Sequence, residues 1–241
     1  MRPEYGETWV YESIVGALPG IDLSDRAAVA LQFSLFQVGL LVLAAVYDLW
    51  TAVLAGTAAV VVAAAGSVVM LRMGAAIRST SAPEPYRRLI FGSSVEVVLG
   101  VLAFIALVTH LFVFDPGTSE EPLIEAFFGP EPSMVAVYLM LLVLWDLCYR
   151  IGASWWTAVI SLWRSYAYPT TPEAAVAFRR VDRLNIGFGL IQLLLVPFVL
   201  DRPVLLVAIT GHVVAVTVVC SLSIVFAKRN RSDQEDFIRR N

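Results

Sequence analysis

Six apolar runs, each close to the length that crosses a lipid bilayer, constrain this sequence more than any other feature. About 20 apolar residues in a helix span the hydrocarbon core of a membrane, and a helix satisfies its own backbone hydrogen bonds there. The sequence therefore predicts an all-α fold, a polytopic transmembrane helix bundle with six spans. The expected spans are residues 27–47, 51–72, 89–114, 134–156, 184–200 and 203–227.

The composition agrees with a membrane domain. Of the 241 residues, 59% are hydrophobic and 15% are charged, and the mean hydropathy is +0.76. A soluble domain carries a smaller apolar share, so the excess is expected to face lipid. We divide the chain into a cytoplasmic N-terminal segment at 1–26, a six-helix membrane domain at 27–227 and a cytoplasmic tail of basic and acidic residues at 228–241. Within the first segment, residues 7–18 have apolar side chains near helical spacing and predict a helix on the membrane surface.

Charge is distributed unequally between the two sides of the predicted bundle. Arginines, together with the single lysine Lys228, concentrate in the segments 72–88, 164–183 and 228–231. The opposite side holds the stretch DPGTSEEPLIEAFFGPEP, with five acids and no base. Because Lys and Arg favour the cytoplasmic side of membrane proteins, we expect both termini in the cytoplasm of a multi-pass protein of the cell membrane.

Two charged residues lie where a membrane helix should have none. Asp146 and Arg150 are four residues apart, so they meet on one helix face and neutralise each other. At about 1.5 Å of rise per residue, Glu96 in the third span lies at a similar depth. We expect Arg150 to bridge Asp146 and Glu96, because one cation shared by two acids leaves no carboxylate unpaired. The full candidate intramembrane polar site comprises Glu96, Asp146, Arg150, Gln192, His212 and Gln37.

Two functions fit such a polar layer. We favour a non-enzymatic membrane protein with a scaffold or assembly role, in which the layer joins the helices. The alternative is a small transporter or channel for an ion, a proton or a small solute, since intramembrane ionisable groups commonly mark such paths. The sequence has no phosphate-binding loop, metalloprotease motif or nucleophile elbow. We therefore predict no enzyme activity, no cofactor and no metal site.

The expected partners are the lipid bilayer and either further copies of this chain or another membrane protein. Nucleic-acid binding is not expected, because the arginines are scattered and alternate with acids. Cys148 and Cys220 lie inside apolar runs and are expected to be buried free thiols.

Local signals mark the ends of several helices. Ser24 is the predicted N-cap of the first span, and Thr171, followed by a proline, caps a cytoplasmic helix that leads into the fifth span. We expect the charges of that lead-in helix to form a solvated face. Pro197 should kink or end the fifth span, and Gly92 and Gly100 permit close helix packing in the third.

The stretches ETWVYESIVGALPGID and DLCYRIGASWW resemble an uncharacterised six-span integral membrane protein family of haloarchaea. The resemblance implies a membrane location and a halophilic archaeal source, and it carries no activity. The net charge of −3 and the single lysine agree with a high-salt habitat.

Overall fold

The structure is a computed structural model that describes residues 8–10, 24–169 and 171–240, with only the backbone described for 229–240. The described part is helical throughout, with no strand. The elements follow in the order α2 (Asp25–Tyr47), α3 (Trp50–Arg78), α4 (Glu84–Phe91), α5 (Val95–Thr109), the π-helix η1 (His110–Phe114), α6 (Asp115–Thr118), α7 (Leu123–Phe128), α8 (Met134–Ala167), α9 (Pro172–Gln192), the 3-10 helix η2 (Leu193–Phe198) and α10 (Pro203–Arg240).

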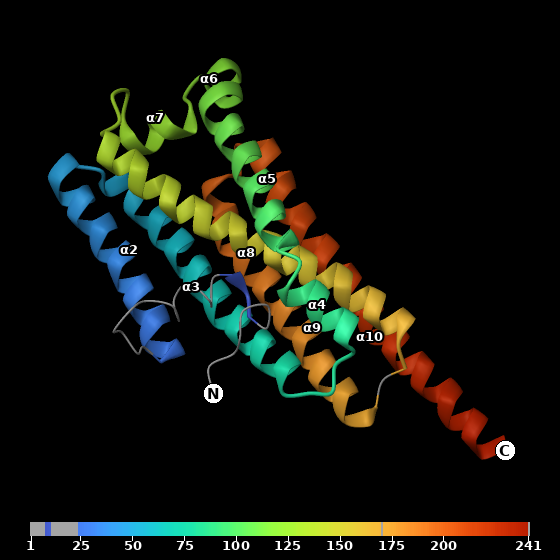
Figure 1. Cartoon of the computed structure of the whole chain (residues 1–241). Helices are drawn as coiled ribbons and strands as arrows, with labels where there is room; N and C mark the ends of the chain where they lie inside the picture. The colour runs from blue at the N-terminus through green and yellow to red at the C-terminus, as the bar shows by residue number, and fades with distance from the viewer. Residues whose placement is uncertain (1–7, 11–23, 170, 241) are drawn as a thin grey trace.

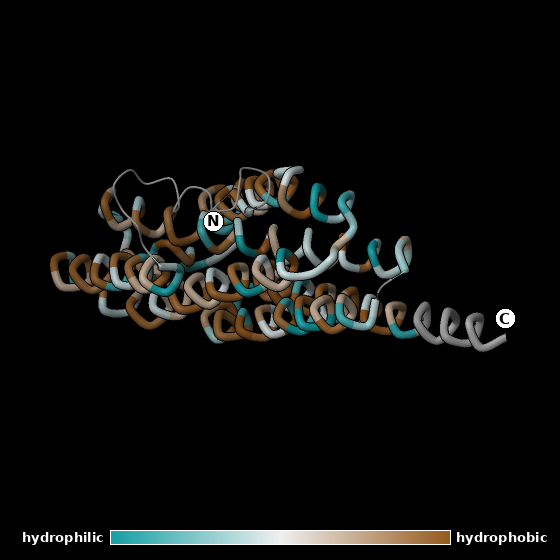
Figure 2. The backbone as a smooth tube through the Cα atoms, turned by 60° about the horizontal axis from the view of Figure 1, so that its bottom comes forward, coloured by the Kyte–Doolittle hydropathy of each residue, from teal (hydrophilic) through white to brown (hydrophobic). Residues whose placement is uncertain are grey.

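Among the described residues, six helical segments are long and apolar enough to cross a membrane. The third of them combines α4, α5, η1 and α6, and the fifth combines α9 and η2. The segments run alternately up and down as one bundle (Figure 1), and apolar residues cover most of their length (Figure 2). The predicted six-span helix bundle is therefore confirmed.

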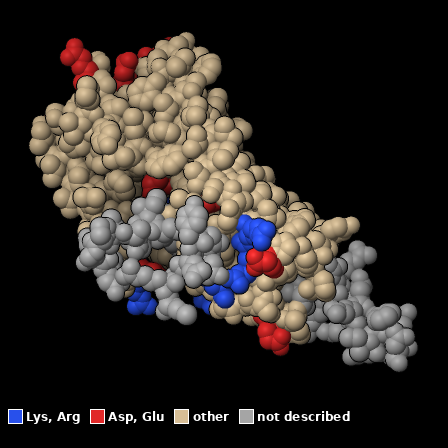
Figure 3. Space-filling view, in the orientation of Figure 1, with Lys and Arg blue, Asp and Glu red and all other residues tan. Residues whose placement is uncertain are grey.

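The two ends of the bundle differ in charge. The connection between α5 and α8, which contains α6 and α7, forms what we call the acidic-loop end. The start of α2, the turn between α3 and α4, and the C-terminal part of α10 lie at the opposite end, which we call the arginine-rich end (Figure 1). On the face shown in Figure 3, the basic side chains gather toward the arginine-rich end. Which side of the membrane each end faces stays a prediction.

Two predicted caps are confirmed. The Ser24 hydroxyl accepts a hydrogen bond from the backbone N–H of Ala27 at 3.3 Å, and the Thr171 hydroxyl accepts one from Ala174 at 3.3 Å. α9 then passes into η2, which contains Pro197 and ends the fifth span as expected. The fourth span is longer than predicted, because α8 continues unbroken past residue 156 to Ala167.

The third span is not the single helix that hydropathy predicts. It breaks after α4, where Ser94 adopts a left-handed conformation with φ 53°. The Ser93 hydroxyl donates to the carbonyl of Leu89 at 2.6 Å and accepts from the N–H of Val95 at 3.4 Å. Such local side-chain bonds compete with the helix ladder, so the break follows from the serines that come after Gly92.

The predicted surface helix at 7–18 falls mostly outside the described residues. Of the described ones, Trp9 is completely buried, and its ring packs edge-on against Phe91 of α4 with 5.3 Å between centroids.

α8 is the central helix and contacts α2, α3, α4, α5, α9 and α10. Its closest neighbour is α5, which crosses it where two glycines meet. A Cβ atom built on Gly152 would lie 2.6 Å from the backbone nitrogen of Gly100, and one built on Gly100 would lie 2.9 Å from the Cα of Tyr149. The predicted role of Gly100 in close packing is confirmed, whereas Gly92 serves as the C-cap of α4.

Candidate functional site

Asp146 and Arg150 form the expected pair within α8. The Arg150 guanidinium donates to both carboxylate oxygens of Asp146, through Nη2 at 2.6 Å and Nε at 3.2 Å. Gln32 of α2 donates its amide to Asp146 at 2.7 Å, and Ser67 of α3 donates to the Gln32 amide oxygen at 3.2 Å. The third guanidinium nitrogen of Arg150, Nη1, lies 3.6 Å from the Met70 sulfur of α3. The pair thus joins three helices.

The predicted bridge from Arg150 to Glu96 is wrong. Glu96 is fully buried, but neither of its carboxylate oxygens has a hydrogen-bond partner in the described part of the chain. Its backbone carbonyl lies against Gly152, whereas the Arg150 side chain packs on Gly66 of α3, against which Phe188 of α9 also lies. Residues 150 and 152 point about 200° apart on a helix. Glu96 therefore sits on the far side of α8 from the cation it was expected to share.

Gln37 contacts neither the Asp146–Arg150 pair nor Glu96 in any described hydrogen bond. Its amide donates to the Thr57 hydroxyl at 3.0 Å and so joins α2 to α3. The single layer predicted from depth is therefore divided among separate helix interfaces.

A second buried ion pair, which the sequence reasoning missed, lies closer to the arginine-rich end. Arg164 of α8 and Asp182 of α9 are each 1% exposed, with Nη2 and Oδ2 at 3.7 Å. Ser223 of α10 donates to Asp182 at 3.0 Å and accepts from Arg164 at 3.4 Å. The guanidinium carbon also lies 3.8 Å from the ring centroid of Phe178 and 5.1 Å from that of Tyr86.

This pair corrects the prediction that the charges of the α9 lead-in form a solvated face. Arg180 and Arg183 are exposed, but Asp182 points into the bundle. A signal was present in the sequence, since Asp182 shares a helical stripe with Phe178 and Asn185 at spacings of four and three residues. Assigning every charge of this helix to a solvated face concealed it.

Asn185 ties the next turn of α9 to its neighbours. Its amide donates to the Ser154 carbonyl at 2.8 Å and to the Cys220 sulfur at 3.6 Å, and its amide oxygen accepts from the Ser154 hydroxyl at 2.7 Å. Cys148 and Cys220 are both free and buried, as expected.

A third ion pair closes the acidic-loop end. Arg202, just before α10, pairs with Asp115 at 2.9 Å and donates to the Glu121 carbonyl at 2.5 Å. Asp115 also accepts from the Ser119 hydroxyl at 2.7 Å and from the backbone N–H of Leu123 at 2.6 Å. These bonds fasten the loop to the first turn of α10.

A cavity of about 440 Å³ lies beneath this closure, and we call it the His–Gln cavity. Its walls come from α3, α5, η1, α7, α8, α9, η2 and α10 and are almost entirely apolar. The polar side chains that line it are His110, Gln192 and His212, together with the thiol of Cys148. Gln192 is 1% exposed, and within the described residues neither amide atom of Gln192, nor Nε2 of His212, has a hydrogen-bond partner.

Two irregular helices form part of the cavity wall. His110 and Leu111 belong to the π-helix η1, and Leu195 and Phe198 belong to the 3-10 helix η2 that follows Gln192. Single π-helical turns and 3-10 stretches inside longer helices often mark functional sites, because they redirect side chains and widen the space between helices.

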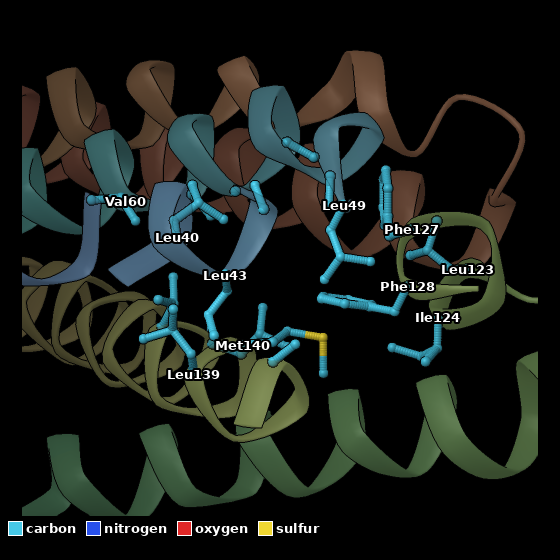
Figure 4. A pocket seen from close by; sticks show the side chains of 18 of the residues that line it. Leu40, Leu43, Leu49, Val60, Leu123, Ile124, Phe127, Phe128, Leu139 and Met140 are labelled. Carbon is cyan, nitrogen blue, oxygen red and sulfur yellow. The ribbon is translucent and has the colours of Figure 1, made fainter. Parts of the chain in front are cut away.

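A second, wholly apolar chamber of about 160 Å³ adjoins the first. Figure 4 shows its side chains, among them Leu40 of α2, Phe127 and Phe128 of the acidic loop and Met140 of α8, converging from different elements. Five residues line both spaces, namely Ala55, Ala59, Leu111, Leu123 and Leu144. Alanines of α3 and leucines of η1, α7 and α8 therefore border both the partly polar cavity and the apolar one.

Of the six predicted site residues, the structure brings Asp146 and Arg150 together as one pair, and Gln192 and His212 together in one cavity. Glu96 and Gln37 join neither group. Within the described residues, no three His, Cys, Asp or Glu side chains are grouped so that they could hold a metal ion.

Comparison with families of known sequences identifies one relationship. A model for a family of unknown function, DUF7530, matches residues 4–223, so this chain belongs to that family. Comparison with curated proteins and with solved structures gives no match.

Proposed function

We propose that this protein is a non-enzymatic multi-pass membrane protein that binds a small amphipathic molecule inside its helix bundle, in the His–Gln cavity. The observation that carries the proposal is that the buried amide of Gln192 and the Nε2 atom of the half-buried His212 line a mostly apolar cavity without a described hydrogen-bond partner. Ligand sites are commonly of this kind, mostly apolar with a few polar groups that orient the ligand.

The energetics favour a ligand with a polar group. A buried donor or acceptor left without a partner costs about 1–3 kcal/mol. The Gln192 amide offers both a donor and an acceptor, so a hydroxyl or carbonyl group placed against it would recover that cost. The adjoining apolar chamber, which shares Ala55 and Ala59 with the cavity, suits the hydrocarbon part of the same molecule.

The ion pairs support a structural role for most of the charged residues. Asp146 is neutralised by Arg150 and bonded to Gln32, and Asp182 is neutralised by Arg164. Buried charges that are paired across helices hold those helices in register. This arrangement agrees with the scaffold interpretation of the polar layer, and it leaves the cavity as the place for a specific ligand.

One observation favours the alternative, a small transporter or channel for an ion, a proton or a small solute. The Glu96 carboxylate is buried without a described hydrogen-bond partner, and intramembrane acids of this kind are common in proton and cation paths. In this alternative, Glu96→Gln abolishes flux in proteoliposomes while ligand binding in the His–Gln cavity is unchanged.

Native mass spectrometry of protein extracted gently with its own lipids, in high salt, tests the ligand-binding proposal. Wild-type protein should carry a reproducible small organic mass. Gln192→Leu, which keeps the volume and removes the amide, should lower its occupancy about tenfold, and Gln37→Leu should retain it. Equal occupancy in Gln192→Leu would overturn the proposal. A copurifying protein subunit in place of a small mass would favour the scaffold role.

Orientation is tested separately. Under the positive-inside rule, the acidic-loop end lies outside the cytoplasm. Glu131 is exposed on this loop, and both native cysteines are buried. Glu131→Cys should therefore react with a membrane-impermeant maleimide added to intact cells, and protection of this cysteine would reverse the topology.

A further inference from the structure

A basic groove lies between α9 and α10 near the arginine-rich end. Its volume is about 540 Å³. The lining residues are Val176, Arg179, Arg180, Arg183, Leu184 and Lys228. Three cations within two turns of α9 thus line the groove together with a fourth, the only lysine in the sequence, on α10.

Among the residues whose side chains the structure describes, none supplies a counter-charge to the groove. No acidic side chain is among its lining residues. Asp182, the acid that lies between these arginines in the sequence, points into the bundle and pairs with Arg164. None of the salt bridges among the described residues involves a cation of the groove. Four positive charges therefore converge on one open space.

The groove also has an apolar component. Val176 is 60% exposed, and Leu184 lies two helical turns further along α9 on the same face. Exposed aliphatic residues next to arginines, at the end of a membrane span, are typical of the level where lipid headgroups meet acyl chains. A soluble anion would use the charges alone, whereas a lipid would use both parts.

We propose that the α9–α10 groove binds the anionic phosphate group of a membrane lipid. The arginine guanidinium matches phosphate geometry by donating two hydrogen bonds at once. Basic grooves between membrane helices recognise anionic headgroups in the same way. The chemistry shared with a free phosphate ion is the negative phosphoryl group, and the lipid adds contacts of its glycerol and acyl parts with Val176 and Leu184. The site is independent of the His–Gln cavity, which lies toward the opposite end.

The test is native mass spectrometry of the purified full chain in a neutral maltoside detergent. The probes are dihexanoylphosphatidylglycerol, dihexanoylphosphatidylcholine and inorganic phosphate, each titrated separately. Wild-type protein should bind the glycerol lipid about tenfold or more tightly than the choline lipid. Arg180→Gln with Arg183→Gln should lose about tenfold or more of that affinity, since each basic residue near an anionic lipid contributes a severalfold factor.

Two controls make the result specific. Arg72→Gln with Arg88→Gln removes the same charge from exposed positions outside the groove and should change the affinity less than twofold. Arg180→Lys with Arg183→Lys retains the charge and should keep binding within a few-fold, which separates loss of charge from misfolding. If inorganic phosphate binds as tightly as the glycerol lipid and is lost in the glutamine variant, the groove binds a phosphate group whose source is soluble. Equal binding of every probe to wild type and to Arg180→Gln/Arg183→Gln overturns the proposal.

Discussion

Two amide side chains on one face of α9 behave in opposite ways. Asn185 and Gln192 are seven residues apart, so they point in nearly the same direction, and both are at most 1% exposed. Asn185 makes hydrogen bonds to α8 and α10, whereas Gln192 lines a cavity without a described partner. The difference lies in the surroundings of the two amides: Asn185 contacts α8 and α10, whereas Gln192 faces a cavity that residues of η1 and η2 help to line.

The two regions of the bundle therefore use their buried polar groups in different ways. Around Asn185 and the Arg164–Asp182 pair, buried polar groups fasten α8, α9 and α10 to one another. Around Gln192 and His212, polar groups face a cavity that suits a ligand. A side-chain amide is structural in one region and available for binding in the other.

The largest expected effect comes from breaking the fastened region. Arg164→Met leaves Asp182 buried without its cation and should destabilise the fold by about 3–5 kcal/mol. Unfolding with SDS in mixed micelles, followed by circular dichroism, measures this. Arg164→Met combined with Asp182→Leu should recover a large part of the loss, because removing both charges also removes the unpaired one. A double variant as unstable as the single one would argue that the two side chains do not act as a pair.

A smaller loss is expected from Asn185→Leu. This change removes the bonds to Ser154 and Cys220, and interhelical hydrogen bonds in membrane proteins contribute about 0.6 kcal/mol on average and up to about 1.7 kcal/mol. The same SDS assay should show destabilisation within this range. Unchanged stability would mean that packing, and not the hydrogen bonds, holds the three helices together at this level.

The smallest effect, and one of opposite sign, is expected from Gln192→Leu. In ligand-free protein this substitution removes a buried amide without a described partner, so it should leave stability unchanged or raise it by up to about 1 kcal/mol. A clear destabilisation, comparable to that of Asn185→Leu, would place Gln192 among the structural amides and remove the contrast between the two regions.

Prediction from sequence succeeded for features that belong to a single helix. Hydropathy located the six spans, and the caps at Ser24 and Thr171 followed from local chemistry. The Asp146–Arg150 pair followed from spacing alone, since residues four apart on a helix meet wherever that helix packs. The break at Ser94 was missed because apolar residues on both sides hid Ser93, whose hydroxyl competes for backbone hydrogen bonds.

Contacts between helices were predicted less well. Depth along a helix gives the level of Glu96, but not the direction in which α5 approaches α8. That direction is set by the contact of Gly100 with Gly152, which places Glu96 against the face of α8 opposite to Arg150. Asp182 was missed for a related reason. The arginines on either side of it favoured an exposed helix face, although its spacing from Phe178 and Asn185 places it on a buried one.

The sequence by itself determined that this chain forms six membrane-spanning helices, where most of them begin and end, and which charges can pair within one helix. Only the tertiary structure decided that Arg164 meets Asp182, that Glu96 stands apart, and that Gln192 and His212 share a cavity. The physical reason is that hydropathy and spacing are properties of one helix. The rotation of each helix against its neighbours depends on where glycines allow close approach and where π and 3-10 turns keep helices apart.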